Sequence, residues 1–157
     1  MLIVFIPLFL FFIDQITKQL VKSSYIPYSS TPLVGDFLKL THVQNPGIIF
    51  GLEIGFPYFL ITFLTLCAVC YLIFLIINAS SKYRLAYLFI LGGALGNLYD
   101  RLLVTFGLQH GVVDFIDIGI NGYRWYIFNF ADIFISCGAI IILFLELFRA
   151  KPINNEI

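Results

Sequence analysis

Two aspartates stand in apolar runs where a charged side chain is costly, Asp114 within residues 112–116 and Asp132 within residues 128–135. Neither has a lysine or arginine within several positions along the chain. A carboxylate in low-dielectric surroundings is strongly unfavourable unless it is protonated, paired or facing water. The chain has only 9 Asp and Glu residues, so their placement indicates that these two have a function.

Two carboxylates that face each other across a water molecule can share one proton and carry out hydrolysis. The ionised member activates the water as a general base, and the protonated member polarises the carbonyl that is attacked. Their mutual repulsion separates the two titrations, so an acid and a base are present at the same pH. This pair of residues therefore favours the chemistry of an aspartic protease.

The sequence lacks the residues that other kinds of hydrolase require. A zinc hydrolase is disfavoured because the only histidines are His42 and His110, and no H-x-x-x-H or similar ligand set exists. A serine nucleophile would need a base, and Ser136 has none nearby in sequence. We therefore expect no metal and no organic cofactor.

The composition is that of an integral membrane protein. Of the 157 residues, 61% are hydrophobic and 11% are charged, whereas soluble domains carry about 25% charged residues. The formal net charge is zero, so no basic surface indicates nucleic-acid binding. Cys67, Cys70 and Cys137 all lie in apolar runs, and we interpret them as small buried hydrophobic residues rather than as a redox or metal site.

Four segments are apolar and long enough to span a hydrocarbon core of about 30 Å, which takes about 20 helical residues. These segments are 2–20, 56–78, 84–101 and 129–148. In the third, the spacing Gly92-x-x-x-Gly96 allows another helix to approach closely. The predicted fold class is all-α integral membrane, with four transmembrane helices in a single domain over residues 1–157.

The two longer connections, residues 21–55 and 102–128, are rich in aromatic and β-branched residues. Residues 37–43 alternate apolar and polar side chains, as a half-buried strand does, and residues 124–127 are a second candidate strand. We expect these loops to form a small β-sheet at the membrane surface, with aromatic residues such as Trp125 at headgroup level.

With four spans, both chain ends lie on the same side of the membrane. Lys82, Arg84, Arg149 and Lys151 gather on that side, close to helix ends. The other side also carries basic residues, so a raw count does not decide the orientation. Because the positive-inside rule applies best to short loops and helix flanks, we expect cytoplasmic termini and an extracytoplasmic sheet.

Folding the four spans brings the unusual polar residues to one face of the membrane. They are Asp14, Lys18, Asn97, Asp100, Arg101, Asp114, Asn129 and Asp132. Asp14 and Lys18 are four apart, acid before base, and should form an ion pair on one helix face. Two plainer interpretations stay open: an interfacial charge network of Asp14, Lys18 and Arg101 that anchors helix ends, and Asp132 as a carboxylate favoured by the helix dipole. The second is disfavoured because Asn129 would already serve as the cap.

Five short segments combine the polar residues described above with small and apolar neighbours. They are residues 14–18 (DQITK), 45–51 (NPGIIFG), 92–101 (GGALGNLYDR), 113–117 (VDFID) and 128–132 (FNFAD). In the order and character of these segments, over essentially the whole chain, the sequence resembles bacterial lipoprotein signal peptidase, also called signal peptidase II. The resemblance implies an aspartic endopeptidase of the bacterial cytoplasmic membrane, with its active site near the extracytoplasmic face. Its substrate would be a diacylglyceryl-modified prolipoprotein, cleaved before the modified cysteine.

Residue by residue, the resemblance implies that Asp114 and Asp132 are the catalytic pair. The pattern around the active site is matched by Asp14, Lys18, Asn45, Gly47, Asn97, Arg101, Asn129 and Ala131. We expect the asparagines to orient peptide carbonyls or the two acids, and the charged residues to hold helix ends and loop in register. Gly47 would allow a close backbone approach or a positive φ.

Two features depart from the family pattern. Ile48 and Ile49 stand where the family usually has small residues, so the pocket near Asn45 should be narrower. The interval of residues 102–113 is longer than usual, which affects the path of that loop. Neither departure involves the two acids.

Two other classes compete with the enzyme. A small proton-coupled transporter would use intramembrane acids as a relay, but it should carry polar residues through the depth of the bilayer, whereas here they cluster at one face. A scaffold held by Gly92-x-x-x-Gly96 would use the aspartates as partner contacts. We favour the peptidase, and expect a monomer that contacts membrane lipids and no nucleic acid.

Overall fold

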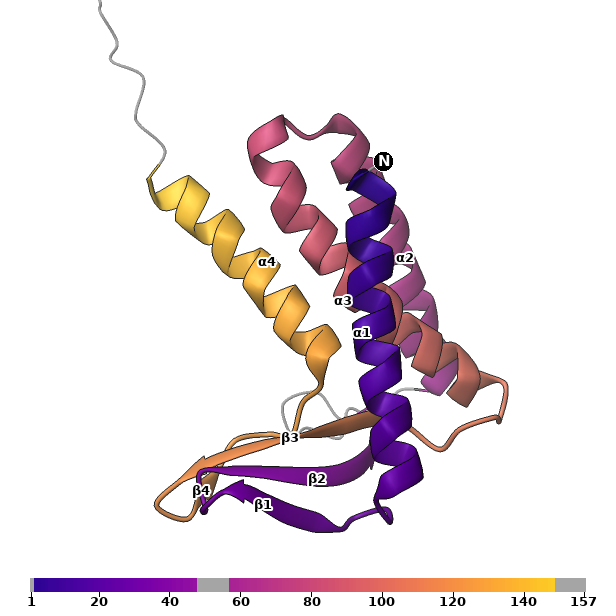
Figure 1. The fold of residues 1–157 in the computed structure, drawn as a ribbon. Coiled ribbons are helices and arrows are strands. Elements are labelled where there is room, and N and C mark those ends of the chain that lie inside the picture. The colour runs from indigo at the N-terminus through magenta and orange to yellow at the C-terminus, as the bar shows by residue number, and fades with distance from the viewer. Residues whose placement is uncertain (1, 48–56, 149–157) are drawn as a thin grey trace, which may run out of the picture.

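The computed structural model of the chain describes residues 2–47 and 57–148. In chain order its elements are α1 (Leu2–Ser24), β1 (Ser30–Val34), β2 (Leu38–Asn45), α2 (Tyr58–Asn78), α3 (Ser81–Thr105), β3 (Val112–Ile120), β4 (Tyr123–Arg124) and α4 (Phe130–Leu147). The helices extend from one side of a small sheet, which lies across their lower ends in Figure 1. Ile48 and Ile49, and the basic residues after Phe148, lie outside the described residues.

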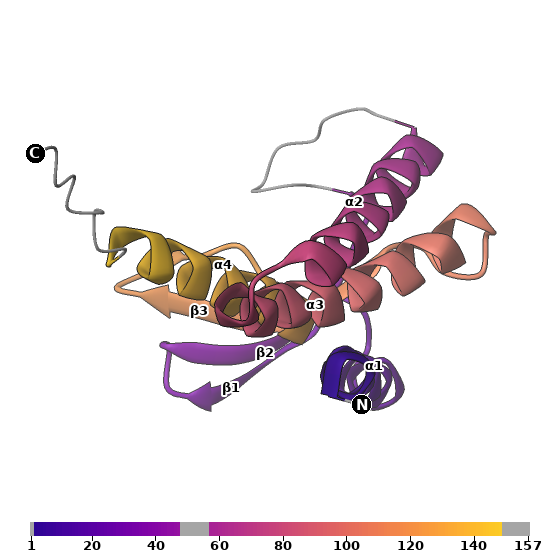
Figure 2. The same ribbon diagram turned by 90° about the horizontal axis from the view of Figure 1, so that it is seen from above.

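Helix α3 is the central helix and packs against α1, α2 and α4 (Figure 2). Glycines make these contacts close. A Cβ added at Gly92 would lie 2.7 Å from the Leu10 Cβ on α1, and one at Gly93 would overlap the Ala131 carbonyl oxygen on α4. A Cβ at Gly96 would also overlap a side chain of α1, so the close approach predicted from Gly92-x-x-x-Gly96 is confirmed.

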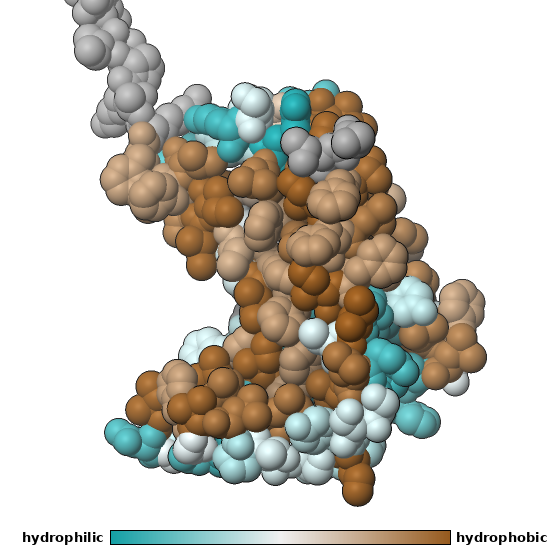
Figure 3. All heavy atoms as spheres, viewed as in Figure 1, coloured by the Kyte–Doolittle hydropathy of each residue, from teal (hydrophilic) through white to brown (hydrophobic). Residues whose placement is uncertain are grey.

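Helices α1, α2 and α4 are long and apolar enough to cross a membrane. Their outward faces carry large apolar side chains such as Phe5, Phe63 and Phe144, which are 62%, 58% and 60% exposed. Hydrophobic surface accordingly covers most of the helical part in Figure 3. The fourth predicted span falls on α3, which is less apolar than the other three helices and packs against all of them.

The sheet is antiparallel, with the strand order β1-β2-β3-β4. Asp114 on β3 pairs with Val43 on β2, two positions before Asn45. The hairpin between β3 and β4 turns at Asn121 and Gly122, whose φ values of 51° and 83° are those of a tight type I′ turn. The register of β2 and β3 therefore decides which side chains of the two strands meet.

The end of α1 packs onto the sheet. Val21 of α1 forms a buried apolar cluster with Val113 and Phe115, the residues on either side of Asp114. Phe130, at the start of α4, packs against the same cluster. This packing holds β3 between the helices and the rest of the sheet.

Several predicted boundaries are wrong. The first helix continues to Ser24, and the third extends past both ends of 84–101. Strand β3 occupies part of the predicted loop 102–128, and it is buried along most of its length, so it has no alternation of apolar and polar residues to reveal it. The second predicted strand, 124–127, is replaced by the short β4, whereas the first is confirmed as β2.

The cysteines differ from the prediction as well. Cys67 and Cys70 are exposed on α2, and Cys137 is half-buried on α4. All three are free thiols. An apolar run in a membrane helix does not distinguish a side chain that faces the protein interior from one that faces lipid, so the expectation of burial is wrong for the C-x-x-C pair.

Candidate active site

Asp114 is 5% exposed on β3, and two amides hold its carboxylate. Asn45 Nδ2 donates a hydrogen bond to Asp114 Oδ2 at 3.0 Å, and Asn129 Nδ2 donates to Asp114 Oδ1 at 2.6 Å. Gly47 steadies the first of these amides, because its N–H donates to Asn45 Oδ1 at 3.0 Å. The φ of Gly47 is +101°, so the predicted positive φ is confirmed.

Asp132 lies in the first turn of α4, which begins with a capping box. The Asp132 N–H donates to Asn129 Oδ1 at 3.1 Å, and the Asn129 N–H donates to Asp132 Oδ2 at 3.1 Å. The capping by Asn129 is thus confirmed, and Asp132 lies in the first helical turn, where the helix dipole favours a carboxylate. The other carboxylate oxygen, Oδ1, accepts a hydrogen bond from Asn97 Nδ2 at 2.9 Å.

Asn129 connects the two acids. Its side chain is fully buried, with Nδ2 on the Asp114 carboxylate and Oδ1 on the Asp132 backbone. Nδ2 also lies 3.3 Å from Asn97 Oδ1. The Asn129 amide therefore sets the position of both carboxylates. A second amide, that of Asn97, contacts both Asn129 and Asp132.

The two carboxylates line the same cavity, whose volume is about 230 Å³. Its walls are Asn45, Gly47, Asn97, Arg101, Val112, Asp114, Tyr126, Ile127, Asn129, Asp132, Ile135 and Ser136. These residues come from β2, α3, β3, α4 and the segment that leads into α4. Most of the site residues proposed from the sequence are thus brought together around one space.

Arg101 supplies positive charge to this cavity. Its Nη1 donates to Thr65 Oγ1 of α2 at 2.6 Å. Among the described residues no carboxylate lies within ion-pair distance of its guanidinium. The predicted interfacial charge network therefore does not include Arg101, which faces the cavity instead.

Burial, together with the negative charge of Asp132, raises the pKa of Asp114 to about 7. The hydrogen bonds from Asn45 and Asn129 act in the opposite direction, because they favour the ionised form. Near neutral pH, Asp114 is thus able both to hold and to release a proton. That is the property a general acid or base requires.

Asp14 and Lys18 lie behind the cavity rather than in its wall. Lys18 Nζ is 2.7 Å from Asp14 Oδ2, as predicted, and also 2.7 Å from Asp100 Oδ2. The same amine donates to Asn97 Oδ1 at 3.1 Å, and Asp14 Oδ1 accepts a hydrogen bond from the Ala131 N–H at 2.9 Å. This buried network ties α1 to α3 and to the first turn of α4.

Sequence reasoning missed two contributors. Asp100, in the polar cluster but not among the proposed site residues, shares Lys18 with Asp14. Tyr126, one of the aromatic loop residues of which the sequence indicated only a position at headgroup level, lines the cavity. Both placements depend on contacts between distant segments, and no local spacing in the sequence signals them.

Within the described residues, no group of three or more His, Cys, Asp or Glu could hold a metal ion.

Comparison with known proteins gives consistent matches. The family model of signal peptidase (SPase) II matches residues 6–148. The lipoprotein signal peptidase of Moorella thermoacetica is 38% identical over 152 residues, which cover 92% of this chain and 91% of that protein. The lipoprotein signal peptidase of Pelagibacter ubique is 35% identical over 153 residues, with coverages of 95% and 89%.

Solved structures agree with the sequence relatives. Two structures described as bacterial membrane enzymes each superpose with a TM-score of 0.80. One is 30% identical and covers 92% of this chain and 87% of its own, and the other is 29% identical with coverages of 94% and 94%. The similarity thus extends over the helices and the sheet together.

Proposed function

The chain belongs to the signal peptidase II family, and on that premise we propose that Asp114 and Asp132 are the catalytic residues of an aspartic endopeptidase. The protein is a bacterial membrane protease that removes signal peptides from prolipoproteins. The observation that carries the catalytic assignment is the single cavity lined by both carboxylates and by the amide that contacts both residues. The family assignment replaces the transporter and scaffold interpretations.

The proposed role of each acid in the reaction follows from the surroundings of its carboxylate. Asp114 is the more enclosed acid and holds a proton near neutral pH, so it donates to the scissile carbonyl oxygen. Asp132 takes a proton from water, whose oxygen forms a bond to the carbonyl carbon. When the tetrahedral intermediate collapses, the C–N bond breaks, the amine leaves with the proton from Asp132, and Asp114 recovers its proton from the hydroxyl group.

The supporting residues have distinct roles in this proposal. Asn129 and Asn45 orient Asp114, and Asn97 orients Asp132. Arg101 faces the cavity as a positive charge toward peptide carbonyl groups. The remaining residues, Asp14, Lys18, Gly47 and Ala131, position these groups through the buried network and the turn after β2.

The acid role of Asp114 predicts the pH dependence of cleavage. Above pH 7 this group loses its proton, so kcat/KM should fall by about tenfold per pH unit. Asn45→Ala removes a hydrogen bond that lowers the pKa of Asp114, and it should move this falling limb to higher pH. The measurement is the pH profile of cleavage, with thermal stability followed over the same range. A rate that rises through pH 7 to a plateau would instead make Asp114 the base.

We also propose that cleavage occurs before a diacylglyceryl-modified cysteine. An apolar cavity of about 500 Å³ lies at the hairpin end of the sheet, lined by Ile118, Gly119, Ile120, Tyr123, Arg124, Trp125 and Phe128. Phe128 directly precedes Asn129, so this cavity adjoins the segment that carries the catalytic amide. Acyl chains of the modified cysteine fit the apolar lining, and they reach it from the bilayer.

The substrate proposal is tested with two precursors that differ only in lipid modification. Wild-type protein in detergent should cleave the lipidated precursor and leave the unlipidated one essentially intact, because the acyl chains supply the binding energy that places the peptide bond. Product formation is followed by gel shift and mass spectrometry. Equal rates for the two precursors would reject the lipid requirement but not the catalytic pair.

The arrangement in the membrane completes the proposal. Helix α3 is a fourth span in one domain, and its polar residues Asn97 and Asp100 are tolerated because they are buried and paired with other polar groups. The sheet and active site lie on the extracytoplasmic side, with both termini cytoplasmic, as the basic residues Lys82 and Arg84 favour. The protein acts as a monomer in contact with membrane lipids, because one chain already supplies both acids and the amides that hold them.

A further inference from the structure

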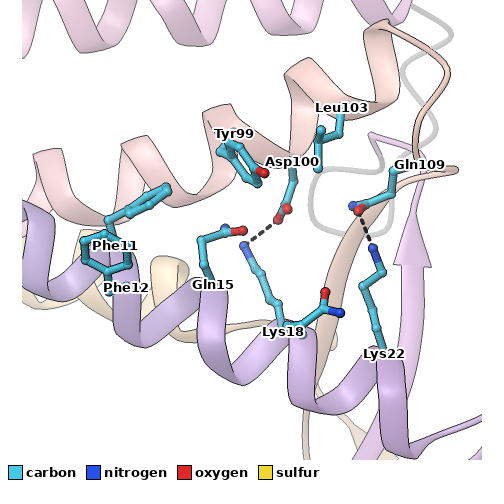
Figure 4. Close-up of a pocket in the computed structure, with 10 residues that line it drawn as sticks. Phe11, Phe12, Gln15, Lys18, Lys22, Tyr99, Asp100, Leu103 and Gln109 are labelled. Carbon is cyan, nitrogen blue, oxygen red and sulfur yellow. Dashed lines mark hydrogen bonds and ion pairs between the residues drawn. The ribbon is translucent and has the colours of Figure 1, made fainter.

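A groove that does not belong to the active site lies between α1 and α3. At its end near the sheet is a cavity of about 320 Å³, with a volume typical of small-ligand sites, roughly 300–1,000 Å³. Figure 4 shows Gln15 and Lys22 of α1, Asp100 of α3 and Gln109 before β3 around this space. In Figure 3, polar surface interrupts the hydrophobic surface between α1 and the lower end of α3.

The groove continues toward the middle of the helices as an apolar cavity of about 260 Å³. It is lined by Leu8, Phe11, Leu95, Leu98, Tyr99 and Leu102, and it shares Phe11 and Tyr99 with the polar cavity. From Leu8 to Lys22 the axis of α1 rises about 21 Å at about 1.5 Å per residue. Half of a hydrocarbon core is about 15 Å, so the groove is long enough for an acyl chain below a headgroup.

The polar end is lined by charges of both signs: Lys18 and Lys22 of α1 and Asp100 of α3. Lys22 Nζ donates to the neutral Gln109 Oε1 at 2.9 Å, and among the described residues no carboxylate lies within ion-pair distance of it. Within residues 2–47 and 57–148, the one ion-pair partner of Asp100 is Lys18, which also pairs with Asp14. Two buried carboxylates thus share this amine, and if Lys22 pairs with the phosphate of a ligand, an ammonium group on the same ligand can pair with Asp100.

We infer that this groove binds a phospholipid whose headgroup carries a phosphate and a primary ammonium, phosphatidylethanolamine. The phosphate pairs with Lys22, and the glutamine amides donate to its oxygens. The ammonium group lies toward Asp100, and one acyl chain follows the apolar cavity past Phe11 to Leu8. A lysine that only extends into water at a helix end would need neither the cavity beside it nor the apolar continuation of that cavity.

The inference is tested by native mass spectrometry of the full chain released from detergent with defined lipids. Phosphatidylethanolamine should remain bound at one site, and about tenfold more of it than of phosphatidylglycerol or diacylglycerol with the same chains, because each lacks a charged contact. Lys22→Gln should lower retention of phosphatidylethanolamine by a similar factor. Lys82→Gln, which removes an interfacial lysine at the opposite end of α3, should not.

A second pair of variants tests the apolar half without changing charge. Leu102→Trp fills the apolar cavity and should reduce retention, whereas Leu143→Trp, on the exposed face of α4, should not. Thermal unfolding of each variant verifies that it is folded. Equal retention of the three lipids, or equal loss in Lys22→Gln and Lys82→Gln, would overturn the inference. Neither result bears on Asp114 and Asp132, because the inference requires only that the protein lies in a membrane.

Discussion

Asp114→Asn and Asp132→Asn should each lower the rate of prolipoprotein cleavage at least about hundredfold. An amide has nearly the shape of a carboxyl group, but it can neither accept the proton of the attacking water nor give one to the carbonyl. Asp36→Asn is the matched control, because Asp36 is 61% exposed in the turn between β1 and β2, away from the cavity. The rate is measured on a lipidated precursor at saturating and at low concentration.

The two losses should not add. If the acids act as one unit, the double variant should be about as slow as the slower single variant. All variants should unfold at temperatures close to that of the wild type, which separates lost chemistry from lost structure. Retention of more than about a tenth of the rate in either single variant would show that the corresponding aspartate is not catalytic.

Lys18→Met should destabilise the protein by about 3–5 kcal/mol, the cost of leaving buried charges without their partner. Lys18 is 2% exposed, and it is the partner of both Asp14 and Asp100. Methionine fills the space of the aliphatic stem but cannot pair with the carboxylates. The measurement is the free energy of unfolding in detergent, or the shift in Tm. Lys22→Met, one turn further along α1 and exposed, should change stability by no more than about 0.5 kcal/mol.

Neutralising the two carboxylates that Lys18→Met leaves unpaired should restore most of the lost stability. In the triple variant Lys18→Met, Asp14→Asn, Asp100→Asn no charge of this network remains, and a neutral replacement of a buried ionic group is often tolerated. Cleavage should recover less than stability, because the hydrogen bond from Lys18 to Asn97 is still missing. If Lys18→Met alone were as stable as the wild type, the buried network would not support the site as proposed.

The sequence predicts the local features of the site more accurately than the distant ones. The Asp14–Lys18 pair and the cap formed by Asn129 depend on spacings of three and four residues within one helix, and both occur in the structure. Strand β3 is different, because residues 112–120 are buried on nearly every side and show no period of two. The Asn121-Gly122 turn was the available signal for it, since this dipeptide favours a tight hairpin.

The sequence by itself determined the membrane setting, the apolar helices and the two carboxylates that are costly to bury. These features depend on composition and on short-range helix geometry, both of which are properties of the local sequence. Only the tertiary structure decided that Asn45 holds Asp114, 69 positions away, and that Lys18 serves Asp100 as well as Asp14. The reason is physical: the register of β2 on β3 and the close packing of α1 on α3 are set by contacts between distant segments, and no local periodicity encodes them.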